Sequence, residues 1–334
     1  MSMKKSTKAI IGVAAGAGAL LGVFNTVVYE CMLNIRLASK IGEKMNPPVV
    51  EAPEEVSPST EAAQEKPAEE KQPDRFFPAM EKWLPDHQPT DIYITNKKGQ
   101  KRHAKLFNNG HPEKWAIIFH GFTSGPGGMY HYAFAYSQMG FNCILPSMIG
   151  HSEDENRYAS MGWHDKHIGL DLIEYITTMY PDAEIVLHGE SMGAATTMLI
   201  TGESIPSNVK CAVEDCGFTT VMDEYTHVTK TSISPVLVPI LPTLSVYSQL
   251  RGNMSFRKCA PIEAVKKSVT PTLFVHGEAD DFVPFRMLNE VYTACAAEKD
   301  FFTVKGAGHA ESVSKEPEFY WTNVYNFVKK YIEI

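Results

Sequence analysis

The sequence has few cysteines and no basic region in its main part. Six cysteines in 334 residues are too few for the disulfide framework of a small secreted domain. Cys143 and Cys211 stand inside apolar runs and are expected in the core, and we predict no structural disulfide. The net charge is −8, and a basic excess occurs only in residues 1–46. The sequence therefore does not predict nucleic acid as a partner.

Motifs of several other enzyme classes are also missing. The chain has neither a phosphate-loop nor a dinucleotide-binding glycine pattern, and we predict no cofactor. His164 and His167 are three residues apart, but no HExxH motif or Cys/His cluster accompanies them, so no metal site is predicted. No internal repeat is visible. With 44% hydrophobic and 21% charged residues, the remaining composition is that of a globular chain with one large α/β core and extensions.

Residues 1–46 are predicted to be a membrane anchor or a signal segment. Three lysines within the first eight residues precede an uncharged run from Ala9 to Tyr29. As a helix this run would be about 31 Å long, close to the thickness of a bilayer's hydrocarbon core. Ala-x-Ala patterns occur only within residues 15–19, where the apolar stretch before them is too short for a cleaved signal, so an anchor is favoured. We expect a single-pass protein of the cell membrane whose main domain is extracellular.

Residues 47–74 are predicted to be a disordered tether between this anchor and the main domain. The segment is rich in proline, glutamate and alanine and has almost no large apolar side chain. Such a composition cannot bury enough surface to offset the entropy of ordering the chain. The main domain is accordingly expected at residues 75–334.

Strand and helix patterns alternate through the main domain. Residues 92–95 and 103–107 are predicted to form an opening hairpin. Six short runs of almost entirely apolar residues without alternation follow, as expected for strands buried on both faces of a parallel sheet: 115–119, 141–145, 185–187, 211–213, 272–275 and 301–304. Helical patterns lie between them. These patterns predict a mostly parallel eight-stranded sheet with helices on both faces.

One insertion, residues 219–268, follows the sixth strand and contains no strand pattern. Ser234–Pro242 within it is apolar and interrupted by prolines, which does not suit a regular core element. Three interpretations are open: a cap over a site, a loop that touches a membrane, or a packed surface connection. The cap is favoured.

A candidate nucleophile lies in the sequence Gly189-Glu-Ser-Met-Gly193. Ser191 follows a predicted strand and precedes a predicted helix, which is the setting of a nucleophile on a tight strand-to-helix turn. The pattern by itself is weak, and its context supports it. A serine needs a base to take its proton. His309, in the glycine-rich loop after the last strand, is the best candidate of twelve histidines.

A carboxylate is expected to orient this histidine. Asp280, shortly after the seventh strand, is preferred over Asp281, which could instead cap the following helix, and over Asp215. Two backbone N–H groups are needed to stabilise an oxyanion, and those of Phe122 and Met192 are predicted.

These elements together resemble the α/β-hydrolase superfamily from about residue 76 to the end of the chain. The details are most similar to bacterial cell-surface hydrolases of the Bem46-like and serine aminopeptidase-like branch. The motifs that carry the resemblance are His120–Gly125, Met161–Trp163, His188–Ala194, Glu214–Gly217, Gly277–Pro284 and Gly306–His309. The resemblance implies the order nucleophile, acid, histidine. It departs at Pro146–Ser152, where relatives carry an Asp and an Arg, so the pocket wall near His151 is uncertain.

The sequence therefore predicts a membrane-tethered serine hydrolase that cleaves carboxylic esters through an acyl-enzyme on Ser191. The apolar Ser234–Pro242 stretch favours esters with hydrophobic parts. A peptidase or amidase with the same three side chains is the alternative enzyme. A surface binding module that keeps the fold without catalysis is the alternative of another class.

Overall fold

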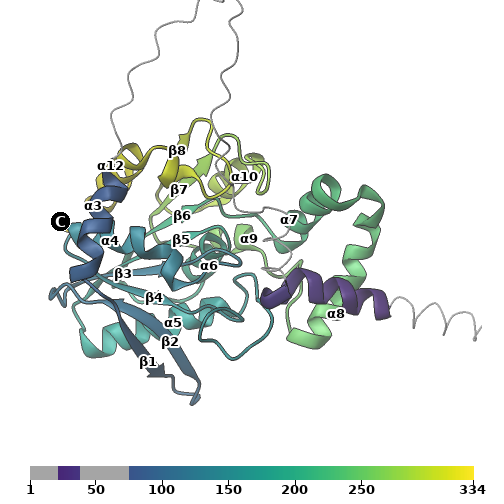
Figure 1. Cartoon of the computed structure of the whole chain (residues 1–334), viewed down its shortest axis with the longest axis horizontal. Helices are drawn as coiled ribbons and strands as arrows, with labels where there is room; N and C mark the ends of the chain where they lie inside the picture. Colours follow the sequence, from purple (N-terminus) through teal and green to yellow (C-terminus); the bar gives the residue numbers. More distant parts are fainter. Residues whose placement is uncertain (1–21, 38–74) are drawn as a thin grey trace, which may run out of the picture.

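The computed structural model describes residues 22–37 and 75–334. Its centre is an eight-stranded sheet with the order β1-β2-β4-β3-β5-β6-β7-β8 (Figure 1). The first two strands pair antiparallel, as do β2 and β4, and every later pair is parallel. The predicted mostly parallel sheet and its opening hairpin are confirmed.

Seven strands extend the predicted runs by one to four residues in total, and β4 is shifted by one residue toward the C-terminus. Their bounds are β1 Thr90–Thr95, β2 Lys101–Phe107, β3 Lys114–Phe119, β4 Asn142–Pro146, β5 Glu184–Glu190, β6 Val209–Asp215, β7 Thr272–Gly277 and β8 Lys299–Val304. The central strands are buried on both faces. This burial explains why their sequences show unbroken apolar runs and no alternation.

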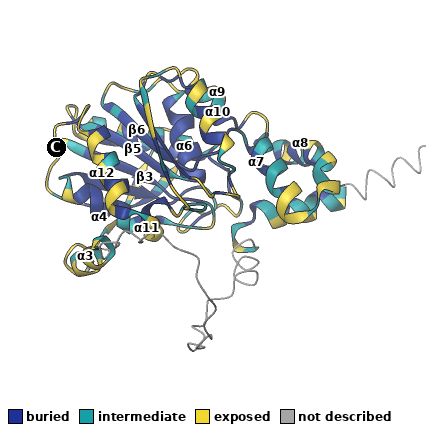
Figure 2. Cartoon of the chain, turned by 90° about the horizontal axis from the view of Figure 1, so that it is seen from above, coloured by how far each residue is buried: buried dark blue, intermediate teal, exposed yellow. Residues whose placement is uncertain are grey.

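Helices cover both faces of the sheet. On one face α5 (Asp165–Met179) and α6 (Met192–Thr201) share a core with Ile117 of β3. On the other face α4 (Tyr130–Gln138) and α12 (Pro317–Val328) pack against its sequence neighbours Ala116 and Ile118. Successive strand residues thus point into opposite layers. In Figure 2 the sheet and α6 form the buried centre.

Shorter helices complete the domain. The chain enters it through α3 (Phe76–Trp83) and the 3-10 turn η1 (Leu84–Asp86), and η2 (Pro126–Met129) leads into α4. A third core, formed by Met198 of α6 and Phe274 of β7, includes residues of α10 (Arg286–Ala294). The short α11 (Ser312–Lys315) precedes α12.

The insertion after β6 is helical throughout most of its length. It contains α7 (Val221–Val228), the π-helical turn η3 (Thr229–Ile233), the 3-10 helix η4 (Pro235–Ile240), α8 (Leu241–Gly252) and α9 (Pro261–Val265). Two of the three prolines that argued against a regular element, Pro235 and Pro242, stand in the first turns of η4 and α8, and Pro239 lies inside the 3-10 helix η4. A proline in a first turn costs no helical hydrogen bond.

Residues 22–37 pack against this insertion and are mostly helical. Tyr29 and Leu33 are buried, and the ring of Tyr29 contacts Tyr247 of α8. The backbone N–H of Ala159 donates to the carbonyl of Leu33. The C-terminal part of the predicted anchor run therefore lies on the folded domain.

Within the described residues, every helix is too short or too polar to cross a bilayer. The first part of the predicted anchor, residues 1–21, lies outside the described residues. So do residues 38–46 and the whole predicted tether, residues 47–74.

Candidate active site

Ser191 lies on a strained turn between β5 and α6. Its backbone has φ 55° and ψ −113°, a conformation that non-glycine residues rarely adopt. Two neighbours must be glycine for this turn to form. A Cβ on Gly189 would overlap the backbone of Gly193, and a Cβ on Gly193 would overlap the carbonyl of Phe119. The strain holds the serine side chain at the carboxyl edge of the sheet.

The structure brings the three predicted side chains into one hydrogen-bonded series. Ser191 Oγ lies 2.8 Å from Nε2 of His309, and Nδ1 of His309 lies 2.8 Å from Oδ2 of Asp280. The Asp280 side chain is fully buried, whereas one-fifth of the His309 side chain is exposed. The alternative Asp281 lies outside this series, and its carbonyl accepts from Nε2 of His227.

A second histidine, which the sequence analysis did not single out, also contacts Asp280. His276 lies in β7, and its Nε2 is 3.3 Å from Oδ2 of Asp280 and 2.9 Å from the carbonyl oxygen of Val283. The backbone N–H groups of Phe282 and Val283 donate to Oδ1 of the same carboxylate. Although burial opposes ionisation, the hydrogen bonds from His276 and His309 lower the pKa of Asp280 to about 2. Asp280 is therefore an ionised acceptor held on both oxygens.

The two predicted oxyanion donors lie on either side of Ser191. Met192 is the first residue of α6, where backbone N–H groups have no acceptor within the helix. Phe122 follows Gly121, and a Cβ on that glycine would lie 3.6 Å from Cβ of Ser191. The loop after β3 thus passes in contact with the serine. The assignment of Phe122 and Met192 as the two oxyanion donors stays a prediction.

Two histidines hold the loop that carries Phe122. His120 is buried, its Nδ1 donates to the carbonyl of Gly121, and its Nε2 accepts from Met148 N–H. Burial lowers the pKa of His120 to about 3, so it stays neutral and does not act as a base. His151, from the loop whose role the sequence left uncertain, accepts from the N–H of Thr123 with its Nε2. Its ring packs against His120 and Phe122.

Three buried carboxyl groups lie beneath the turn of Ser191. Burial raises the pKa of Glu190 to about 7, of Glu214 to about 8 and of Asp215 to about 6. Tyr132 donates to Glu190, and the N–H of Gly217 donates to Glu214. Asp215 acts through its backbone, because its carbonyl accepts from the N–H of Ser191. The alternative Asp215 therefore supports the nucleophile turn and does not orient His309.

One group of side chains near the serine could offer ligands to a metal. The donor atoms of Cys216, Asp280 and His309 lie within 4.8 Å of one another. His309, however, uses both ring nitrogens in hydrogen bonds to Ser191 and Asp280. Burial also raises the pKa of the Cys216 thiol well above its usual range, which disfavours the thiolate a metal requires. The arrangement fits proton transfer better than metal binding.

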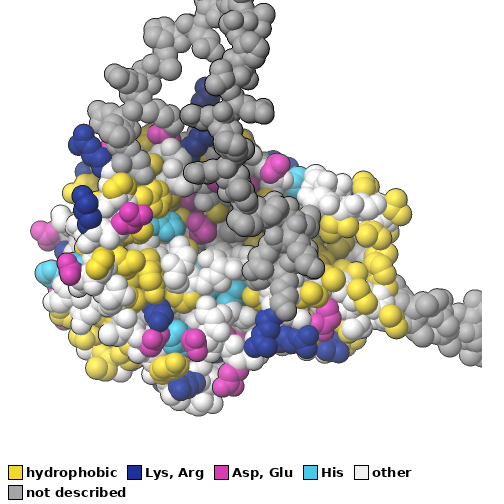
Figure 3. All heavy atoms as spheres, in the orientation of Figure 1, with side chains coloured by type: hydrophobic (Ala, Val, Ile, Leu, Met, Phe, Trp, Pro, Cys, Tyr) yellow, Lys and Arg dark blue, Asp and Glu magenta, His cyan; other side chains and the backbone are white. Residues whose placement is uncertain are grey.

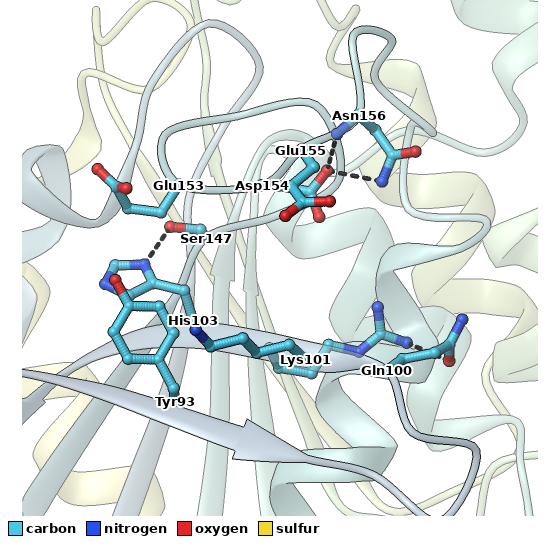
Figure 4. Close-up of a pocket in the computed structure, with 10 residues that line it drawn as sticks. Tyr93, Gln100, Lys101, His103, Ser147, Glu153, Asp154, Glu155 and Asn156 are labelled. Carbon is cyan, nitrogen blue, oxygen red and sulfur yellow. Dashed lines mark hydrogen bonds between the residues drawn. The ribbon is translucent and has the colours of Figure 1, made fainter.

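A polar pocket of about 450 Å³ lies apart from Ser191, between β2 and residues 153–156 (Figure 4). In it, Nδ1 of His103 lies 2.7 Å from Ser147 Oγ, and its Nε2 lies 2.7 Å from Asp91. This series has the same residue types as the one at Ser191. Here, however, Nδ1 of the histidine contacts the serine and Nε2 contacts the aspartate, which is the reverse of the arrangement at His309. Ser147 also lies beyond the end of β4 and not on a strained turn. We interpret this series as a link between β1, β2 and the segment after β4.

Comparison with known proteins identifies the family of the chain. The model of the prolyl oligopeptidase family matches residues 129–334. The chain belongs to this family. The chain is therefore a serine hydrolase of esterase or peptidase type.

Individual relatives are distant. An uncharacterised protein of Bacillus subtilis, YqkD, is 24% identical over 216 residues, which cover 64% of this chain and 70% of YqkD. The structure is similar to that of the Pyrococcus furiosus esterase Pf2001, with TM-score 0.60 and 19% identity over 75% of this chain and 94% of the esterase. It is also similar to the Pyrococcus horikoshii acylaminoacyl peptidase, with TM-score 0.54 and 17% identity over 73% of this chain and 41% of the peptidase. At these identities the likeness shows the α/β-hydrolase fold.

Proposed function

We propose that this chain is a membrane-attached serine hydrolase that cleaves carboxylic esters through an acyl-enzyme on Ser191. The hydrogen-bonded series from Ser191 through His309 to Asp280 carries the proposal. Activation of a serine requires a base that takes the hydroxyl proton and a carboxylate that orients this base. The site supplies both, and it holds the serine on a strained turn. The finer placement in the Bem46-like branch stays a prediction from the sequence motifs.

The reaction follows from these contacts. Ser191 Oγ attacks the ester carbonyl carbon while its proton passes to Nε2 of His309, and the carbonyl oxygen becomes an oxyanion between the N–H groups of Phe122 and Met192. His309 then gives that proton to the departing alcohol oxygen, which leaves the acyl group on Ser191. A water molecule, deprotonated by His309, attacks the acyl carbon and releases the acid.

Aromatic side chains at the site support an apolar substrate. Phe282 is 44% exposed and its ring lies 4.9 Å from that of His309. Phe122, on the oxyanion loop, is half-buried. Apolar surface beside the reacting group favours acyl or alcohol parts of low polarity.

A fluorophosphonate probe tests the catalytic proposal directly. The full chain should be labelled, and both labelling and hydrolysis of nitrophenyl esters should be lost in Ser191→Ala. Ser147→Ala is the matched control, because Ser147 also contacts a histidine, and it should keep both. An unlabelled wild-type chain would indicate a binding module, and labelling that persists in Ser191→Ala would place the nucleophile elsewhere.

A peptidase is the second candidate, and Glu224 of α7 favours it. Both of its carboxylate oxygens are buried and have no hydrogen-bond partner within the described residues. Burial raises its pKa to about 8, with a further contribution from Asp280. A substrate ammonium group would supply the missing partner. If so, Glu224→Gln should raise KM for aminoacyl nitroanilides and leave neutral esters unchanged.

Membrane attachment is proposed from the sequence of residues 9–29. The run is uncharged and apolar. Because its residues 22–29 pack on the domain, residues 9–21 are the part available for insertion into lipid, and as a helix they would reach about 20 Å into the hydrocarbon core. The full chain should float with vesicles in a density gradient and resist extraction at alkaline pH. Ile11→Asp combined with Val13→Asp should abolish flotation, because charged groups are costly in the hydrocarbon core. Equal flotation of this variant would refute attachment through the run.

A further inference from the structure

The outer side of the insertion carries an unusual concentration of exposed apolar side chains. Six of them are more than half exposed, and we call them the apolar face: Val23, Val27, Ile233, Val236, Val246 and Leu250. Elsewhere within the described residues, only Tyr93, Met179 and Val269 among the large apolar side chains exceed that fraction. Figure 3 shows apolar side chains gathered over this part of the molecule. A patch of this kind marks an interaction surface.

Two neighbouring helices carry four of the six side chains of the apolar face, and the other two, Ile233 and Val236, lie in η3 and η4. Thr26 bonds to the hydroxyl of Tyr247, and Thr243 bonds to Asn25, so the helix that begins at residue 22 runs beside α8 in the same direction. Figure 1 shows the two side by side. Val23 and Val27 are one turn apart on the first helix, as are Val246 and Leu250 on α8. Each helix thus turns one apolar row inward and presents another to the outside.

The charges around this face suit an anionic lipid surface. Residues 235–250 contain no charged side chain, and residues 229–252 contain Lys230 and Arg251 but no acidic residue. Both basic side chains are exposed, as is Arg36 at the end of the first helix. Apolar residues with basic residues at their edge are the composition of segments that lie in the membrane interface.

An uncharged apolar run directly precedes this face in the sequence. Residues 9–21, directly before the first helix, are uncharged and apolar, and they continue the run that ends at Tyr29. They join the described structure at Gly22, beside the start of α8 and next to η4, which carries Val236. If residues 9–21 insert into a bilayer, the apolar face at their end would therefore come to the membrane surface.

We propose that the apolar face lies against the lipid bilayer, so that the insertion after β6 is the membrane-facing side of the hydrolase. This inference rests on the membrane attachment proposed above and is independent of the catalytic mechanism. A second copy of the chain is the competing occupant. The uncharged run that enters at the face and the basic residues at its edge favour lipid.

Spin labels on the full chain in vesicles of phosphatidylcholine and phosphatidylglycerol test the proposal. Cys31 is the one exposed cysteine and is first replaced by serine. Labels are then placed at Val236→Cys and Leu250→Cys, with Val269→Cys as the control, since Val269 is 87% exposed on the loop between α9 and β7 and does not belong to the apolar face. The measurement is the ratio of each label's collision rate with oxygen, which concentrates in lipid, to its collision rate with a water-soluble nickel chelate. This ratio should be severalfold higher for the labels at 236 and 250 than for the label at 269.

The outcomes separate the proposals. If the chain floats with vesicles but all three labels report water, the apolar face does not meet the membrane, while attachment and catalysis stand. If the chain does not float, both the attachment and this inference fail, and fluorophosphonate labelling still judges catalysis. The labels at 236 and 250 could also be shielded from water by a second copy of the chain. In that case the shielding should disappear when each vesicle holds a single copy, and this result would overturn the proposal.

Discussion

Oδ2 of Asp280 lies between His276 and His309, at 3.3 Å from Nε2 of the first and 2.8 Å from Nδ1 of the second. His276 therefore acts on the candidate site through the carboxylate and does not touch Ser191 or its substrate. Because Nε2 of His276 also donates to the carbonyl of Val283, its ring is held in place beside the carboxylate and limits the carboxylate's movement.

Replacing His276 should reduce turnover more than substrate binding. His276→Ala is expected to lower kcat about 10- to 100-fold with little change in KM, because an unheld carboxylate orients His309 less well. His276→Gln keeps an N–H donor and should recover much of the loss. Steady-state kinetics on a nitrophenyl ester measure both. Equal losses in the two variants, or a change confined to KM, would contradict a positioning role.

Asp280→Asn should lower kcat by about 10⁴ while the protein stays folded, since the amide can no longer stabilise the protonated histidine. Asp281→Asn is the matched control and should retain near wild-type kcat, because its side chain lies outside the series. Circular dichroism confirms folding, and the ester assay compares the two. Comparable losses would mean that the acid is misassigned.

The buried Glu214 makes the fold less stable at alkaline pH. Its pKa is about 8 in the folded protein against an ordinary value near 4.3. The folded state thus binds more protons than the unfolded state between these values, so its contribution to stability falls as the pH rises from about 4 to 8.

Glu214→Gln should remove this pH dependence. We compare the difference in free energy of unfolding between the variant and the wild type at two pH values. This difference should be more favourable to the variant at pH 8 than at pH 5 by at least about 1 kcal/mol, which corresponds to about 2–4 °C in Tm. Glu263→Gln, at an exposed pair with Lys266, serves as the control and should show no such difference. Thermal denaturation at the two pH values gives the answer, and parallel curves for wild type and Glu214→Gln would refute it.

The helix at residues 22–37 should be a stable part of the domain. Tyr29→Ala removes a buried ring that contacts Tyr158 and Tyr247, and it should destabilise the docking of this helix by about 3 kcal/mol. Hydrogen exchange of amides in the helix should accelerate while β5 stays protected. The exposed Val27→Ala should leave exchange unchanged, and a rapidly exchanging helix in the wild-type chain would contradict docking.

Local sequence determined most of the sheet and the identity of the candidate catalytic side chains. The strands were predicted from short apolar runs, and Ser191 and His309 from the glycine-rich turns around them. Both signals depend on a few neighbouring residues, because periodicity and turn chemistry are local properties. The same reasoning predicted no regular element for residues 234–242, whereas the structure has η4 and the start of α8 there. The sequence alone does not distinguish a proline in the first turn of a helix from one that breaks a helix.

Tertiary structure decided the rest. The contact of His276 with Asp280 depends on the path of the loop after β7, which places the carboxylate beside a strand residue. The packing of Tyr29 on α8 joins residues more than two hundred positions apart, and no local pattern distinguishes an apolar run that docks from one that only inserts into lipid. The local sequence determines which side chains are present and the local conformation around them. Which residues they contact depends on long-range packing, because burial is a property of the whole fold.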